Sequence, residues 1–82
     1  MTTRDLLPCQ QAALFRVLAA RFGSRHAEAC VEVHRIGSVG RAVSVDLYFP
    51  SVDLDGGPVL RFDSRWELGP AGGTRRAAMV RA

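Results

Sequence analysis

The stretch 43–50 constrains the fold of this chain more than any other. It reads Val-Ser-Val-Asp-Leu-Tyr-Phe-Pro, so apolar and polar residues alternate without a break. Successive side chains of a β-strand point to opposite faces, and this alternation is typical of a strand with one buried face. The apolar face would carry Val43, Val45, Leu47 and Phe49, and the polar face Ser44, Asp46 and Tyr48. We expect Pro50 to end the strand.

The flanking segments predict one helix and two further strands. Pro8 suits the first turn of a helix, and Gly23 suits its end because glycine readily takes the left-handed conformation found there. At 100° per residue, one side of the helix gathers the residues that we expect in the core, which are Leu14, Phe15, Leu18 and Phe22. Period-two patterns predict strands over 28–36 and 59–68.

The alternation also predicts how the strands face and pair. In the strand over 59–68, we expect the core side to carry Leu60, Phe62, Trp66 and Leu68, and the outer side to carry Arg61, Asp63, Arg65 and Glu67. Matching apolar faces places Val33 opposite Val43 or Val45. The second register would put Glu32 opposite Asp46, and because facing like charges destabilise a sheet, we favour the first. Asp46 would reach Arg61 or Arg65.

Glycines and prolines predict turns between these elements, at 23–26, 37–40, 51–58 and 69–73. The tail 74–82 fits a fourth strand or two helical turns, and we lean slightly to the strand. The predicted class is therefore α+β. We expect a single domain over 1–82, in which the N-terminal helix packs on an antiparallel meander of three to four strands (αβββ, with a fourth strand or a short C-terminal helix).

Length and composition restrict the function. A chain of 82 residues buries a small core, which leaves little room for a deep enzyme cleft. No apolar run reaches the roughly 20 residues of a membrane span, and residues 1–5 lack the features of a signal peptide, so we expect a cytoplasmic protein without membrane contact. Cys9 and Cys30 lack a Cys-x-x-Cys pattern and should be reduced thiols, a crosslink through Cys30 being the alternative.

Catalytic and metal motifs are weak. His26, Cys30 and His34 are spaced by four, but on a strand such positions lie about 13 Å apart, too far to share one zinc ion. A hydrolytic triad of Cys30, His34 and Asp46 would lack an activating arrangement and a cleft. The acidic stretch 53–57 lacks the closing glutamate of a calcium loop. We therefore predict no catalytic residue, no metal and no cofactor, and a protein that is not an enzyme.

The charge pattern leaves two kinds of partner open. All eleven basic residues are arginine, the formal net charge is +3, and arginine suits bidentate contacts with carboxylate or phosphate. Arginines of the helix and tail would form a patch that neutralises nucleic-acid phosphates. A charged sheet face with an exposed tyrosine and free edge strands would instead suit docking onto a larger protein.

The segment Gly72-Gly-Thr-Arg-Arg-Ala-Ala78 resembles the end of a double-stranded-RNA-binding domain. That family has a glycine-rich turn, a small hydroxyl residue, paired basic residues and alanine at the start of its last helix. The resemblance covers 72–78 and implies an αβββα fold with Thr74 as helix cap and Arg75 and Arg76 on phosphates. The chain departs from the family because it stops after two turns and lacks the Gly-Pro-x-His pattern after the first strand.

A small, arginine-rich, cofactor-free domain is also similar in kind to the anti-CRISPR proteins of phages and mobile elements. That group shares no motif, so the resemblance assigns no residue roles. It implies an inhibitor that docks on a host nucleoprotein complex, such as a CRISPR surveillance complex, and obstructs recognition of target DNA. This is the function that we expect, as a monomer or homodimer, and the nucleic-acid-binding domain is the alternative. The expected partner-binding residues are Arg61, Arg65, Asp46, Tyr48, Arg16, Arg21, Arg75 and Arg76.

Overall fold

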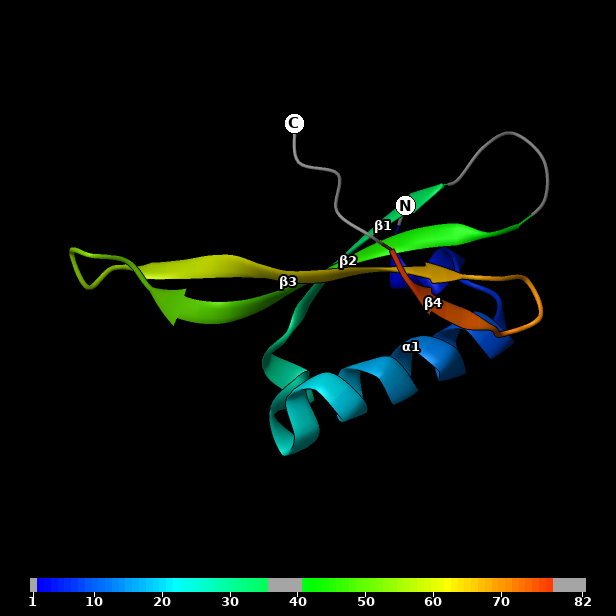
Figure 1. Ribbon diagram of the computed structural model, residues 1–82, viewed down its shortest axis with the longest axis horizontal. Helices are drawn as coiled ribbons and strands as arrows, with labels where there is room; N and C mark the ends of the chain where they lie inside the picture. The colour runs from blue at the N-terminus through cyan, green and yellow to red at the C-terminus, as the bar shows by residue number, and fades with distance from the viewer. Residues whose placement is uncertain (1, 36–40, 78–82) are drawn as a thin grey trace.

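The computed structural model describes residues 2–35 and 41–77. The helical elements are η1 (Thr3–Asp5), α1 (Pro8–Phe22) and η2 (Gly23–Glu28). The strands are β1 (Cys30–Arg35), β2 (Val43–Val52), β3 (Pro58–Leu68) and β4 (Thr74–Arg76). They form one antiparallel sheet in the order β1-β2-β3-β4, and α1 lies along one face of it (Figure 1). The predicted α+β class is confirmed, and the tail contributes a fourth strand over 74–76. The predicted turn at 37–40 and the tail end 78–82 lie outside the described residues.

Helix α1 has the predicted bounds but presents a different side to the sheet. Pro8 lies in its first turn, and Gly23 follows Phe22 with a φ of 58°. Its buried residues are Gln10, Ala13, Leu14 and Val17. The prediction that Phe15 packs in the core is wrong, because its side chain is 57% exposed and its ring meets His26 edge-on at 4.9 Å. The small Ala13 and the hydrogen-bonding Gln10 take the contact side instead.

The hydrophobic core lies between α1 and the sheet. Its fully buried members are Leu6, Ala13, Leu14, Val17, Val33, Val43, Val45, Leu47 and Leu68. Leu18, Phe22, Val31 and Trp66 pack around them with partial exposure. Burying each Leu or Val side chain contributes about 1.5–3 kcal/mol, so the few residues that β2 directs at the helix supply a large part of the stability.

Strand β2 is longer than predicted and continues through Pro50 to Val52. Its pairing with β1 ends where Tyr48 faces Cys30, whereas its pairing with β3 continues to Val52. Pro50 is therefore tolerated because it lies where β2 has a partner on one side only, and a missing N–H costs little at such an edge. Beyond Tyr48, the two strands project past β1 and the helix as a two-stranded arm, defined here as residues 48–62 (Figure 1).

A β-bulge in β3 reverses part of the predicted facing. Leu47 pairs with Ser64 but Tyr48 pairs with Phe62, so Asp63 is the extra residue. One inserted residue moves every earlier side chain of a strand to the opposite face. Leu60 and Phe62, predicted in the core, instead lie away from the helix and are 53% and 40% exposed. Arg61 and Asp63, predicted to face outward, lie on the helix side.

Candidate functional site: the outer face of the sheet

The outer face is the face of the sheet that points away from α1, and none of the described helices covers it (Figure 1). Its residues follow from the strand register. Between β1 and β4 they are polar, namely Glu32, His34, Ser44, Asp46, Arg65, Glu67 and Arg75. On the arm they are mainly apolar. The face therefore has two parts, which meet at Tyr48.

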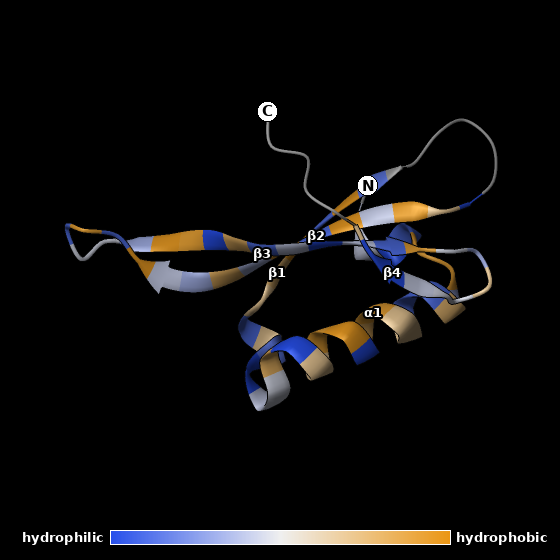
Figure 2. Cartoon of the chain, in the orientation of Figure 1, coloured by the Kyte–Doolittle hydropathy of each residue, from blue (hydrophilic) through white to orange (hydrophobic). Residues whose placement is uncertain are grey.

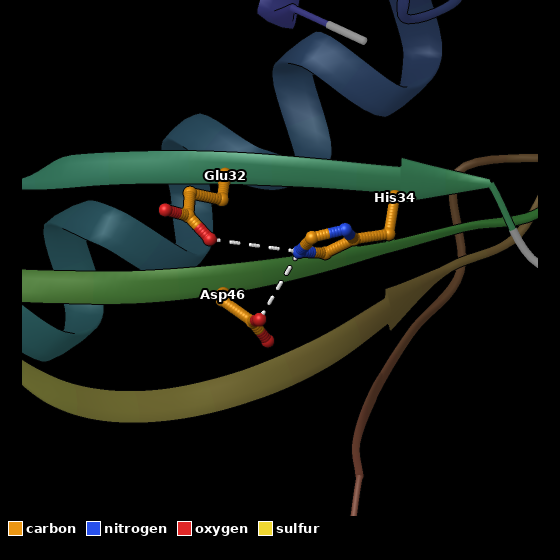
Figure 3. Close-up of side chains that lie close together, drawn as sticks. All are labelled: Glu32, His34 and Asp46. Atoms are coloured by element: carbon orange, nitrogen blue, oxygen red, sulfur yellow. Dashed lines mark ion pairs between the residues drawn. The ribbon is translucent and has the colours of Figure 1, made fainter.

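Asp46 is the centre of the polar part. Its Oδ1 accepts a hydrogen bond from Arg65 Nε at 2.5 Å, and its Oδ2 accepts one from Arg65 Nη2 at 2.9 Å. His34 Nε2 lies 3.2 Å from Asp46 Oδ2 and 3.7 Å from Glu32 Oε2 (Figure 3). We expected Asp46 to be exposed, but its side chain is only 5% exposed because these neighbours cover it.

Arg65 dominates the electrostatics of this cluster. Its hydrogen bonds lower the pKa of Asp46, against the opposing effect of burial, and the charge of His34 contributes a smaller lowering. The same bonds raise the pKa of Arg65. We predicted that Asp46 would reach Arg61 or Arg65. The strand register places Arg65 directly opposite Asp46, so the contact with Arg65 is the one that forms.

The same cluster corrects the predicted register of β1. Val33 faces Val45, so Glu32 faces Asp46, and the register that we favoured is wrong. The prediction counted the repulsion between the two carboxylates but not the side chains that separate and neutralise them. Arg65 neutralises Asp46 from the β3 side, and the imidazole of His34 lies between the two acids.

Tyr48 connects the polar cluster to the arm. Its hydroxyl donates to Glu32 Oε2 at 3.4 Å, and its ring meets the Phe62 ring edge-on with centroids 5.7 Å apart. Partial burial raises the pKa of Tyr48, and the negative charges of Glu32 and Asp46 raise it further. The phenol therefore stays neutral and remains a hydrogen-bond donor.

The arm carries a concentrated apolar surface, which we call the apolar arm face. It comprises Tyr48, Pro50, Val52, Leu60 and Phe62, with Leu54 at the tip. Val52 is 62% exposed and Leu54 is fully exposed. Of the large apolar side chains that are exposed in the described residues, Phe15 alone lies outside the arm. Figure 2 shows hydrophobic residues recurring along the arm towards its tip.

The opposite side of the arm is anchored to the body of the protein. Phe49 stacks on Phe22 of α1 with ring centroids 4.9 Å apart, and the Arg25 guanidinium lies 4.7 Å from the centre of the Phe49 ring. Arg61 donates to Ser51 Oγ at 3.0 Å and to the Val52 carbonyl at 3.2 Å. The two contacts of Phe49 join the arm to α1 and η2, whereas the Arg61 hydrogen bonds link the two strands of the arm to each other. The apolar arm face is not covered by any described element.

The eight predicted partner-binding residues do not share one surface. Asp46, Tyr48, Arg65 and Arg75 lie on the outer face, where Arg75 pairs with Glu67. The other four, Arg16, Arg21, Arg61 and Arg76, lie on the helix side. Sequence reasoning placed Glu32 and His34 on the open sheet face but not among the partner-binding residues, and it missed Leu60 and Phe62, which it placed in the core. The apolar positions Leu60, Phe62, Trp66 and Leu68 alternate with charged ones, and the polar Ser64 breaks this alternation. That break was the sign in the sequence that the facing of Leu60 and Phe62 could differ from the facing of Trp66 and Leu68.

Arg21 holds the bulge rather than presenting a free charge. Its Nε donates to Asp63 Oδ2 at 3.1 Å and its Nη2 donates to Oδ1 at 2.9 Å. Ser64 Oγ also donates to Asp63 Oδ2 at 2.6 Å, and the Trp66 indole donates to Ser64 Oγ at 2.9 Å. Hydrogen bonds from Arg21 lower the pKa of Asp63, with smaller contributions from Ser64 and from the charge of Arg76.

Comparison with protein-family models, with curated proteins and with solved structures finds no match to this chain. In the part of the chain that the structure describes, no helix has the length and apolar character needed to cross a membrane. We therefore infer the function from the geometry of the outer face.

Proposed function

We propose that this protein is a non-enzymatic binding module that docks onto a larger protein through the apolar arm face. The observation that carries the proposal is the exposure of Leu60 and Phe62 beside Tyr48 on a projecting hairpin. Monomeric proteins rarely expose contiguous apolar patches of more than a few hundred Å², and larger ones usually mark a contact surface. Aromatic residues at such a surface supply much of the binding free energy.

The anchoring of the arm favours binding without a large ordering cost. A two-stranded ribbon is marginally stable by itself in water. Here the stacking of Phe22 on Phe49 and the Arg25 guanidinium over the Phe49 ring hold the ribbon against the body, and the hydrogen bonds of Arg61 join its two strands. A surface that is already ordered loses less conformational entropy on binding and so retains more of its contact energy.

The charges of the arm favour a partner with basic residues around an apolar site. The turn at the tip carries Asp53 and Asp55, and Asp53 Oδ1 accepts the backbone N–H groups of Asp55 and Gly57 at 2.9 and 2.8 Å. An apolar hairpin with an acidic tip is complementary to a basic nucleic-acid channel. We therefore propose that the partner is a host nucleoprotein complex, such as a CRISPR surveillance complex, and that the arm obstructs its recognition of DNA.

The nucleic-acid-binding alternative has less support. Four of the described arginines, Arg21, Arg25, Arg65 and Arg75, already pair with carboxylates. Phosphate binding by these arginines would require those pairs to break. Residues 74–76 form a strand, whereas the double-stranded-RNA-binding resemblance requires them to begin a helix. The acidic tip would also repel a phosphate backbone.

Site-specific crosslinking tests this proposal. A photoreactive phenylalanine analogue is placed at Phe62 in one variant and at Phe15 in another, because both rings are exposed but Phe15 lies on the helix. We expect position 62 to crosslink a subunit of a nucleoprotein complex from host lysate, and position 15 not to do so. Crosslinking of equal yield from both positions would contradict the proposal, and crosslinking of position 62 only to a second copy of this chain would replace the partner with a homodimer.

Binding of the captured complex, once purified, supplies the quantitative test. Phe62→Ser should weaken binding at least about tenfold, since an aromatic anchor is lost. Phe15→Ser should leave the affinity unchanged, and thermal unfolding of both variants serves as the folding control. The free protein should also lower the affinity of the complex for its DNA. Binding of this protein to bare duplex DNA or RNA with a steep salt dependence, unaffected by Phe62→Ser, would favour the nucleic-acid alternative.

A further inference from the structure

The Glu32, His34 and Asp46 side chains form an arrangement that suits a transition-metal ion. Nε2 of His34 lies 3.2 Å from Asp46 Oδ2 and 3.7 Å from Glu32 Oε2, and one ligand atom from each residue lies within 4.8 Å of the others (Figure 3). Ligands at 2.0–2.1 Å from a tetrahedral zinc ion are about 3.3 Å apart. We propose that these three residues bind Zn²⁺, with a fourth position left open to water.

The strands hold the three donors without help from an ion. Glu32 and Asp46 face each other across β1 and β2, and His34 follows Glu32 by two residues, so that all three point to the outer face. In the sequence, we rejected a site made of His26, Cys30 and His34 because positions four apart on a strand are too distant. Cross-strand neighbours on one face are much closer, and it is this pairing that brings the donors together.

Arg65 orients the carboxylate that would be the buried ligand. The side chain of Asp46 is 5% exposed, and both its oxygens accept hydrogen bonds from Arg65. Partners of this kind behind a ligand fix its orientation, and their loss typically lowers metal affinity. Each oxygen retains a lone pair for an ion. The two carboxylates and one guanidinium leave a net negative charge at the cluster, which favours a cation.

The hydroxyl of Ser44, beside the cluster, gives a second reason to expect a bound ion here. It is buried and has no hydrogen-bond partner among the described residues. Ser44 faces His34 in the register and precedes Asp46 by two residues, so its side chain lies on the outer face next to the cluster. Buried polar groups are rarely left without a partner, and a metal-bound water would supply one.

The donor set selects the class of metal. Carboxylates alone suit Mg²⁺ or Ca²⁺, whereas an imidazole nitrogen together with carboxylates suits Zn²⁺ and its neighbours in the first transition row. Cys30 lies opposite Tyr48 and outside the cluster, so we expect no thiolate ligand. The inference does not rest on the proposed docking function, because its three ligands lie in the polar part of the outer face, which meets the apolar arm face only through the contact of Tyr48 with Glu32.

Metal titration of the intact protein tests the site. The chain has two histidines, so His26→Gln is a matched control for His34→Gln. We expect the wild type and the His26 variant to bind one Zn²⁺ by calorimetry, and the His34 variant to bind it at least about tenfold more weakly. Zinc should raise the unfolding temperature of the first two proteins, because a ligand stabilises the state that binds it. Without zinc, the unfolding temperatures should be similar.

Cobalt substitution identifies the ligands by spectroscopy. Co²⁺ bound to nitrogen and oxygen donors should give weak visible bands without the intense charge-transfer band of a thiolate, and Cys30→Ser should leave the spectrum unchanged. Absence of zinc binding at millimolar concentration would overturn the proposal. Equal affinity of the wild type and the His34 variant, or a thiolate band that disappears in the Cys30 variant, would do the same.

Discussion

Replacement of Gln10 by methionine should destabilise the protein more than any other single polar substitution on α1. Gln10 is 1% exposed, and its Nε2 donates to the Arg41 carbonyl at 2.7 Å and, more weakly, to the Leu68 and Gly69 carbonyls at 3.4 Å. Its Oε1 accepts the Leu7 N–H at 2.9 Å, at the start of the helix. One side chain thus links the helix to two segments that flank β2 and β3.

The magnitude follows from these contacts. Methionine has a similar volume, so the cavity contribution is small and the loss comes from the hydrogen bonds. Two good bonds contribute about 1 kcal/mol each, and leaving the buried Leu68 carbonyl with one partner fewer adds to this, so we expect a loss of about 2 kcal/mol. For a domain of this size, 1 kcal/mol shifts the unfolding temperature by about 4–8 °C. The expected decrease is therefore roughly 8–16 °C.

The neighbouring glutamine provides the matched control. Gln11 is exposed, and its Nε2 donates to the Leu6 carbonyl at 3.2 Å and to the Thr3 carbonyl at 3.4 Å. Gln11→Met should change the stability by no more than about 0.5 kcal/mol, as is usual for exposed positions. Urea unfolding followed by circular dichroism measures both variants. If Gln10→Met and Gln11→Met unfold at the same urea concentration, the linking role of Gln10 is refuted.

Two further predictions concern charge and backbone conformation. The pKa of Asp63 is lowered in the folded state, so its ionised form stabilises the protein at neutral pH and protonation favours the unfolded state. Stability should therefore decrease as the pH falls from about 5 towards the lowered pKa, and Asp63→Asn should show a shallower decrease in urea unfolding over that range; identical slopes would contradict this assignment. Gly72 has a φ of 87°, and a Cβ there would lie 3.3 Å from Cys9 Cβ. Gly72→Ala should cost about 1–2 kcal/mol in thermal unfolding, whereas Gly73→Ala, whose Cβ would meet nothing within 4 Å, should cost much less; a reversed order would refute the conformational argument.

The elements that local chemistry determines were predictable from the sequence. Pro8 and Gly23 mark the ends of α1 because their backbones suit those positions, and the structure places the ends there. The period of two identified β1, β2 and β3, and their order followed from short connections. These features depend on residues close together in the chain, and so no knowledge of tertiary contacts was needed.

The features that failed prediction depend on contacts between distant segments. An unbroken period of two would place Leu60, Phe62, Trp66 and Leu68 on one face, because all four are even-numbered. The extra residue Asp63 breaks that relation without changing the numbering pattern. The Glu32–Asp46 register likewise looked unfavourable until Arg65 and His34 were placed beside it. The outer site could therefore be found only in part, because its apolar half depends on a bulge and its polar half on a register.

The bulge connects a residue of α1 to the placement of the apolar arm face. Two residues of β3, Asp63 and Ser64, point to the helix side, and Arg21 holds the carboxylate of Asp63 with two hydrogen bonds. Because these bonds connect α1 to the extra residue, they favour the register in which Phe62 emerges on the outer face. Arg21 was predicted as a partner-binding residue. That role stays a prediction, and the observed contacts show that Arg21 holds the extra residue on which the placement of the apolar arm face depends.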